Sequence, residues 1–62
     1  MCESHAYILR DDREELVMED VVKVAEEGGK IRLSNIIGEE SVLEAEIASI
    51  TFLDHKIILR PR

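Results

Sequence analysis

Cys2 is the residue of this 62-residue chain with the clearest potential for chemistry, because it is the only cysteine and directly follows Met1. Cysteine is small enough at this position for removal of Met1 to be expected. The mature chain would then begin with an α-amine and a thiol on one residue. Together they can close a five-membered chelate ring on a soft or borderline metal, and such donors suit nickel, copper and zinc. The sequence therefore predicts Cys2 as a metal ligand.

Three other roles for Cys2 stay open at this point. A cysteine in a frayed terminus carries out no chemistry, and an exposed thiol can be oxidised to an intermolecular disulfide that imitates a functional pairing. A catalytic nucleophile would need a base such as histidine and an orienting group around a pocket. A chain this short offers little room for such a pocket. We therefore expect no catalytic residue and no enzymatic activity.

The two histidines, His5 and His55, are the other candidate nitrogen ligands. Successive side chains of a strand point to opposite faces, so a strand that is regular from its first residue turns His5 away from Cys2. After removal of Met1, His5 is fourth in the chain, whereas the amino-terminal copper and nickel motif needs histidine in third place. We expect His5 to be a solvent-exposed strand histidine and His55 to be a turn residue, with a ligand role as the alternative for each.

The composition predicts one small acidic domain over residues 1–62. Its net charge of −6, from 14 acidic and 8 basic residues, argues against a nucleic-acid partner, because phosphate binding normally needs a basic surface. No apolar run approaches the roughly 18 residues of a membrane helix, and no export signal is visible. A lone cysteine without such a signal fits the reducing cytoplasm. We expect the carboxylate pairs to lie on solvated faces: Glu14-Glu15, Glu26-Glu27 and Glu39-Glu40.

The small size of the domain also predicts oligomerisation. Domains of this length usually need disulfides, a structural metal or oligomerisation as support, and a single cysteine excludes an internal disulfide. The commonest soluble oligomer is a two-fold symmetric dimer. Across its axis, two copies of Cys2 would supply two sulfurs and two nitrogens, a donor set that favours square-planar Ni(II). We therefore expect one Ni(II) ion per dimer.

Short strands separated by tight turns dominate the pattern along the chain. Gly28-Gly29 separates two runs with β-branched residues and predicts a hairpin, because primed two-residue turns need positive φ. Ile31 and Leu33 alternate with polar residues, as in a half-buried strand. We predict a second hairpin with Asp54-His55 in its turn, and a first strand over 6–9.

Helical spacing competes with this interpretation over 17–24 and 43–50. The valines of the first window disfavour a helix, because a branched Cβ loses rotamer freedom there. The strand interpretation gives six or seven short strands. It predicts an all-β fold, either a small antiparallel barrel or a sandwich.

Several short motifs occur in a characteristic order and spacing: Met1-Cys2-Glu3-Ser4-His5-Ala6-Tyr7, Met18-Glu19-Asp20-Val21, the Gly28-Gly29 hairpin, Asn35-Ile36-Ile37-Gly38-Glu39 and Asp54-His55-Lys56-Ile57. In these motifs the chain resembles the CooT family of small nickel-binding accessory proteins. The family more often has an aromatic residue than isoleucine at position 37, which is a difference in packing rather than in chemistry. The resemblance implies a small SH3-like antiparallel barrel that forms a homodimer, with nickel bound by Cys2.

From Cys2 and the family resemblance together, we predict that the protein is a nickel-binding metallochaperone or storage protein. Its client would be carbon monoxide dehydrogenase, whose maturation the resemblance implies, or another nickel enzyme. The alternative is a small SH3-like module that binds RNA or a protein partner. Relatives are also described as RNA-binding, a role that the charge of this chain does not support.

Overall fold

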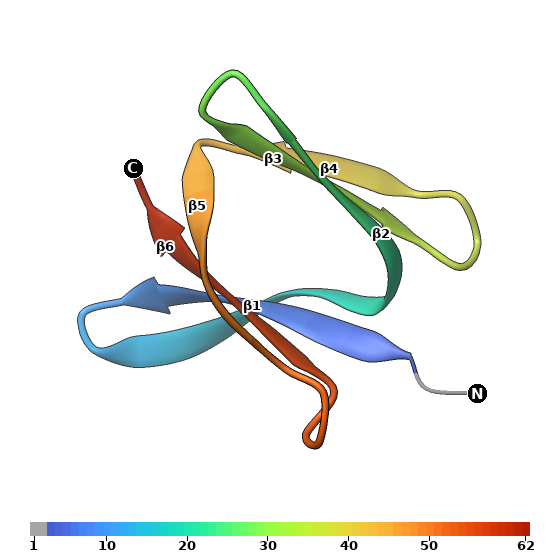
Figure 1. The fold of residues 1–62 in the computed structure, drawn as a ribbon, viewed down its shortest axis with the longest axis horizontal. Helices are drawn as coiled ribbons and strands as arrows, with labels where there is room; N and C mark the ends of the chain where they lie inside the picture. The colour runs from blue at the N-terminus through green and yellow to red at the C-terminus, as the bar shows by residue number, and fades with distance from the viewer. Residues whose placement is uncertain (1–2) are drawn as a thin grey trace.

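The computed structural model describes residues 3–62, which form one curled sheet of six strands in the order β4-β3-β2-β1-β6-β5 (Figure 1). This confirms the prediction of an all-β fold of about six strands. The strands are β1 (Ser4–Arg10), β2 (Arg13–Glu27), β3 (Lys30–Asn35), β4 (Glu40–Leu43), β5 (Ala45–Thr51) and β6 (Lys56–Pro61).

One strand pairing differs from the expected antiparallel barrel. β1 and β6 run parallel, with Ala6 opposite Ile57 and Ile8 opposite Leu59, while the other pairings among the described strands are antiparallel. Parallel neighbours cannot be joined by a tight turn and need a long connection. Here the connection contains β2 to β5, so β1 lies inside the sheet between β2 and β6.

The turns between neighbouring strands follow the sequence closely. Gly28 and Gly29 have φ angles of 55° and 82°, and Glu27 lies opposite Lys30, as the predicted two-residue hairpin requires. The second predicted hairpin is also present between β5 and β6, and His55 has a φ of 54° in its turn. The sequence thus predicted both hairpins because their turn residues tolerate left-handed backbone angles.

β2 is the longest of the six strands. The apolar residues around Val17 and Val22 belong to this one 15-residue strand. The strand bends at Asp20, which has a φ of 55°. A bulge of this kind bends a strand without ending it. The windows 17–24 and 43–50 contain no helix, so the strand interpretation is confirmed.

The core lies on the concave side of the sheet, where Ile31, Leu33 and Leu59 are fully buried. Ile31 and Leu33 lie two residues apart, as the alternation in the sequence predicted. Ala6, Ile8, Val21, Ala45 and Ile57 complete the buried cluster. The buried cluster thus draws residues from β1, β2, β3, β5 and β6.

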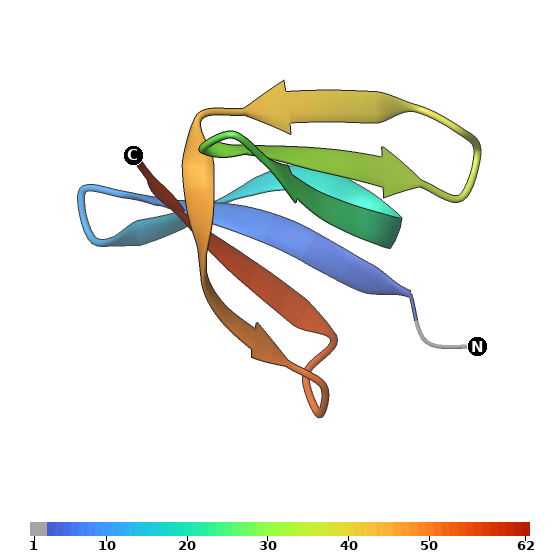
Figure 2. The same cartoon turned by 45° about the horizontal axis from the view of Figure 1, so that its top comes forward.

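The sheet curls like a half-barrel, and its two edge strands, β4 and β5, meet at one corner (Figure 2). Glu44 alone separates the two strands in sequence. Arg62 fastens this corner: its backbone N–H donates to the Glu44 carbonyl at 3.2 Å, and its Nε donates to the Ala45 carbonyl at 3.2 Å. Its Nη2 also donates to the carboxylate of Glu26 on β2 at 3.1 Å. Arg62, which directly follows β6, thus contacts both β2 and β5.

Candidate functional site

The predicted metal ligand Cys2 lies outside the described residues, which begin at Glu3. The role of Cys2 therefore stays a prediction. Over residues 3–62, no group of three or more His, Cys, Asp and Glu side chains is arranged to hold a metal ion. The described part of the chain also contains no helix long and apolar enough to cross a membrane.

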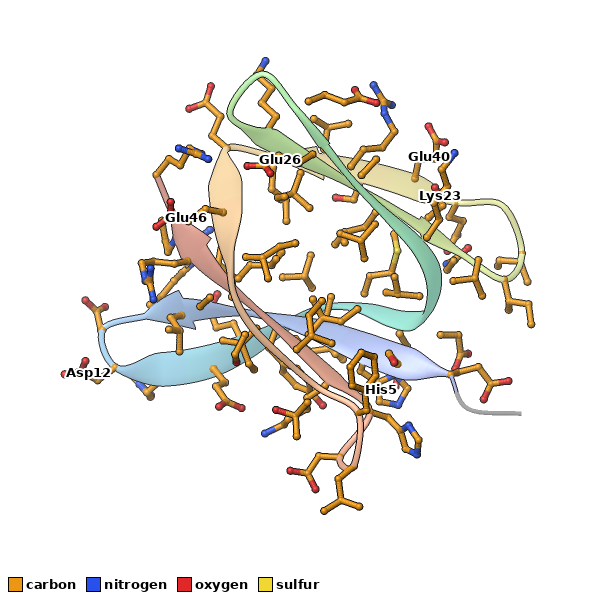
Figure 3. The ribbon with its side chains drawn as sticks, viewed as in Figure 1. His5, Asp12, Lys23, Glu26, Glu40 and Glu46 are labelled. Atoms are coloured by element: carbon orange, nitrogen blue, oxygen red, sulfur yellow. The ribbon has the colours of Figure 1, made fainter. Side chains whose placement is uncertain are left out.

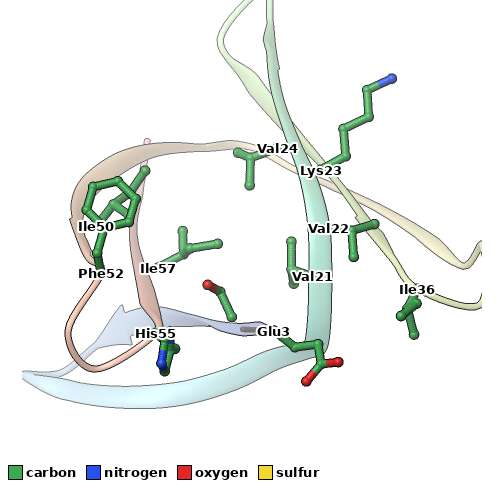
Figure 4. A pocket seen from close by; sticks show the side chains of 11 residues that line it. Glu3, Val21, Val22, Lys23, Val24, Ile36, Ile50, Phe52, His55 and Ile57 are labelled. Carbon is green, nitrogen blue, oxygen red and sulfur yellow. The ribbon is translucent and has the colours of Figure 1, made fainter. Parts of the chain in front are cut away.

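An apolar groove opens between β2 and the β5–β6 hairpin, next to the start of β1 (Figure 4). Its volume is about 610 Å³. Val21, Val24 and Ile57 point into it from opposite walls. Glu3 and Ser4 contribute to its rim, so the groove begins at the residues that directly follow Cys2 in the sequence. The remaining lining residues are Val22, Lys23, Ile36, Ile50, Phe52 and His55.

The groove leaves large apolar side chains in contact with water. Phe52 is 83% exposed and Val22 is 60% exposed, and Ile36 and Ile50 are about half exposed. Single exposed apolar residues are normal on a soluble protein, but these residues line one groove and so make it a candidate interaction surface. The sequence did not predict this groove, because its residues come from four separate segments that only the curled sheet brings together.

The structure corrects the prediction that His5 is a solvent-exposed strand histidine. His5 is half-buried near the start of β1, and its Nδ1 accepts a hydrogen bond from the backbone N–H of Asp20 at 3.2 Å (Figure 3). A neutral imidazole that accepts at Nδ1 carries its hydrogen on Nε2. Both nitrogens are then engaged or protonated, so His5 does not offer a metal a free lone pair in this arrangement.

His55 is an exposed turn residue, as predicted. Its backbone carbonyl accepts a hydrogen bond from the N–H of His5 at 3.0 Å, which fixes the β5–β6 turn against β1. This contact places His55 in the lining of the groove together with Glu3 and Ser4. A long-range contact of this kind could not be predicted from the position of His55 in the sequence.

The carboxylate pairs lie on solvated faces, as expected, and several of them form exposed ion pairs. Glu14 accepts a hydrogen bond from Lys56 Nζ at 2.7 Å. This bond raises the pKa of Lys56 above its usual value. Exposed ion pairs contribute little to stability.

Comparison with known proteins agrees with this fold. The family model described as "CO dehydrogenase accessory protein CooT" matches residues 1–60. A crystal structure assigned as CooT from Carboxydothermus hydrogenoformans superposes with a TM-score of 0.91 and has 36% sequence identity, with 98% of each chain covered. None of the curated proteins compared with the chain matches it. On the match to the family model and on this structural similarity, the chain belongs to the CooT family.

Proposed function

We propose that this protein is a nickel-binding accessory protein that carries Ni(II) as cargo through Cys2 and delivers it to carbon monoxide dehydrogenase or to another nickel enzyme. The observation that carries the proposal is the exposed apolar groove at Glu3 and Ser4, directly after Cys2, in a member of the CooT family. Such a protein has to release its cargo as well as hold it. A ligand close to the chain terminus suits transfer of the metal by ligand exchange.

One chain provides only half of a square-planar site. The thiolate of Cys2 and one nitrogen beside it are two donors, whereas Ni(II) in tetragonal geometry takes four. His5 does not supply a third donor, because its Nδ1 already accepts the N–H of Asp20. Two chains related by a two-fold axis would supply two thiolates and two nitrogens. We therefore propose that the cargo site is shared between two copies of the chain.

The groove supports this arrangement as the contact between the two copies. Phe52 projects from the β5–β6 turn at the edge of the groove, so the same face carries both a hollow and an apolar side chain that can fill one. A two-fold interface needs such self-complementarity, because the same surface patch of both copies takes part in it. An apolar side chain on one copy can then fill the hollow on the other copy, and the reverse. Since the rim includes Glu3 and Ser4, pairing through this face would bring the two copies of Cys2 toward the axis.

The size of the chain is consistent with such a contact. A stable interface covers about 800 Å² on each partner. The chain exposes 4306 Å² in total. Covering the groove and its apolar rim would therefore remove from water a substantial part of the surface of a domain that is small for independent stability.

Nickel stoichiometry tests the shared site directly. We expect titration of Ni(II) into reduced, tag-free protein to saturate at one metal for every two chains, with a thiolate-to-nickel absorbance band and a dimer mass in native mass spectrometry. Tight binding of one nickel per chain would contradict the shared site. A saturating dimer without nickel-dependent absorbance would remove nickel from the proposal and leave only the dimer.

Phe52→Glu tests the groove as the dimer contact. Placing a charge at this exposed turn position should leave the fold of one chain intact but raise the dimer dissociation constant by roughly 30-fold or more, as loss of an apolar anchor of about 2 kcal/mol does. Analytical ultracentrifugation measures this change. Val42→Glu is the matched control, because Val42 is 46% exposed on β4 and does not line the groove. Equal dissociation constants for the two variants would place the interface elsewhere.

A further inference from the structure

The bend of β2 leaves one backbone N–H without a partner in the strand ladder. Between two paired positions, Ser4 opposite Val21 and Ala6 opposite Met18, β1 advances by two residues and β2 by three. The additional residue makes a bulge, and Asp20 adopts a φ of 55° within it. A half-buried N–H that is left without an acceptor is costly, so its partner is of structural importance.

The side chain of His5 supplies that partner. Its Nδ1 accepts the N–H of Asp20 at 3.2 Å, while the carbonyl of Asp20 accepts the N–H of Ile36 at 3.0 Å. The backbone N–H of His5 donates to the carbonyl of His55 at 3.0 Å. His5 therefore connects the start of β1 to the bend of β2 and to the β5–β6 turn, which are three segments that surround the apolar groove.

This contact depends on the protonation state of the imidazole. The Nδ1 lone pair can accept a hydrogen bond only when the ring is neutral and its hydrogen is on Nε2. A protonated ring carries hydrogen on both nitrogens, so its Nδ1–H would face the N–H of Asp20. Histidine is the side chain whose ordinary charge change falls between about pH 5 and 8.

We propose that His5 is a positioning residue: its neutral imidazole holds the start of β1 against the bend of β2, and protonation releases this contact. This role of His5 deepens the proposed function. It rests on that function only in its link to Cys2, which lies three positions before His5 in the sequence. At neutral pH the contact joins the start of β1 to the bend of β2. On acidification the start of β1 loses this contact with Asp20 but stays paired with β2 through Ser4 and Val21.

Charged groups of both signs flank His5 on the segments packed around it. Lys56 lies opposite His5 in the β1–β6 register, and its Nζ is paired with a carboxylate oxygen of Glu14 at 2.7 Å. A variant of His55 separates any contribution of that residue from the role of His5. These groups are Glu3, Glu14, Glu19, Asp20, His55 and Lys56.

The test follows the Asp20 amide and the imidazole nitrogens by ¹⁵N NMR in the metal-free protein from pH 8 to pH 5. At pH 8 we expect the Nε2–H tautomer of His5 and a protected Asp20 amide. At pH 5 the protection of this amide, corrected for the intrinsic exchange rate, should fall about tenfold, as loss of one hydrogen bond implies. If His5 of the unmodified protein carried its hydrogen on Nδ1 at pH 8, this nitrogen could not accept the N–H of Asp20, and the proposal would be overturned.

Three variants separate this role from a purely structural one. His5→Asn places its amide oxygen near the position of Nδ1 and cannot be protonated, so the Asp20 amide should stay protected at both pH values. His5→Phe keeps an aromatic ring without an acceptor and should lack the protection at both. His55→Asn, at a turn position that asparagine tolerates, should behave like the unmodified protein. A pH-dependent loss that persists in His5→Asn would contradict the proposal.

The readout uses no metal, so it fails or succeeds independently of nickel binding. Loss of nickel binding with an intact Asp20–His5 contact would count against the proposed function alone. An unprotected Asp20 amide at pH 8 in a protein that binds nickel would count against the positioning role alone.

Discussion

Cys2→Ser is expected to lower the nickel affinity of the protein by more than about 100-fold. Removal of a group that only supports a metal ligand typically costs 10–100-fold in affinity, and loss of the ligand itself removes more. A serine hydroxyl stays protonated near neutral pH and is a harder donor than a thiolate, so it does not replace the sulfur on Ni(II). Isothermal titration in competition with a chelator measures the affinity, and the thiolate-to-nickel band should disappear.

A double variant provides the matched control for this experiment. Cys2→Ser combined with Ser4→Cys keeps one thiol per chain but moves it to the half-buried first residue of β1, away from the chain terminus. We expect this variant to bind nickel as weakly as Cys2→Ser, because the thiol no longer shares a residue with the proposed nitrogen donor. Equal and weak binding by Cys2→Ser and by the unmodified protein would show that Cys2 is not the ligand.

The same site predicts the direction of the pH dependence. A thiol and a nitrogen donor must lose their protons before they bind a metal, so binding releases protons and weakens as the pH falls. Nickel affinity should therefore be clearly lower at pH 6 than at pH 8.5, also in His5→Asn, in which the His5–Asp20 contact does not titrate. The same affinity at the two pH values would contradict a thiolate–nitrogen site.

Leu33→Ala is expected to have the largest effect on stability. Leu33 is fully buried in the core, and replacement of such a residue by alanine costs about 2–5 kcal/mol, because it removes apolar contacts and leaves a cavity. A domain of this length has a total unfolding free energy of only about 3–9 kcal/mol. The variant should therefore lose half or more of its stability and should be partly unfolded in dilute urea.

Leu53→Ala is the control for this measurement, since it makes the same chemical change at a turn position that is 89% exposed. It should change the unfolding free energy by no more than about 0.5 kcal/mol. Urea unfolding followed by circular dichroism gives both values. The protein concentration must be equal in all samples, because dimer formation adds a concentration-dependent contribution. Similar decreases in the unfolding free energy for the two variants would mean that burial of Leu33 does not stabilise the core.

The residues that predicted the fold correctly are those whose effect is local. Gly28-Gly29 specifies a hairpin because both residues take positive φ, and the alternation of Ile31 and Leu33 specifies which strand face is buried. The bend of β2 was not predicted, because Asp20 makes a bulge within one continuous strand and no glycine or proline marks this position.

The parts that the sequence could not predict depend on contacts between distant segments. The parallel pairing of β1 with β6 joins the two ends of the chain, and no local pattern indicates it. The role of His5 requires the bulge at Asp20 to be known first, so the exposed strand histidine was the natural expectation. The groove arises in the same way, from the curl of the sheet. Cys2 was identified by its chemistry alone, and that prediction awaits the nickel titration.

The parallel pair of β1 and β6 also has a consequence for how the protein folds. Lys56 lies opposite His5, so the central strand of the sheet obtains its second neighbour only from the last residues of the chain. Contacts of such large sequence separation slow folding, because a long loop must close before they form. During synthesis, the hairpin of β2 and β3 can form before β6 has been made, whereas β1 acquires its second neighbour only once β6 is available.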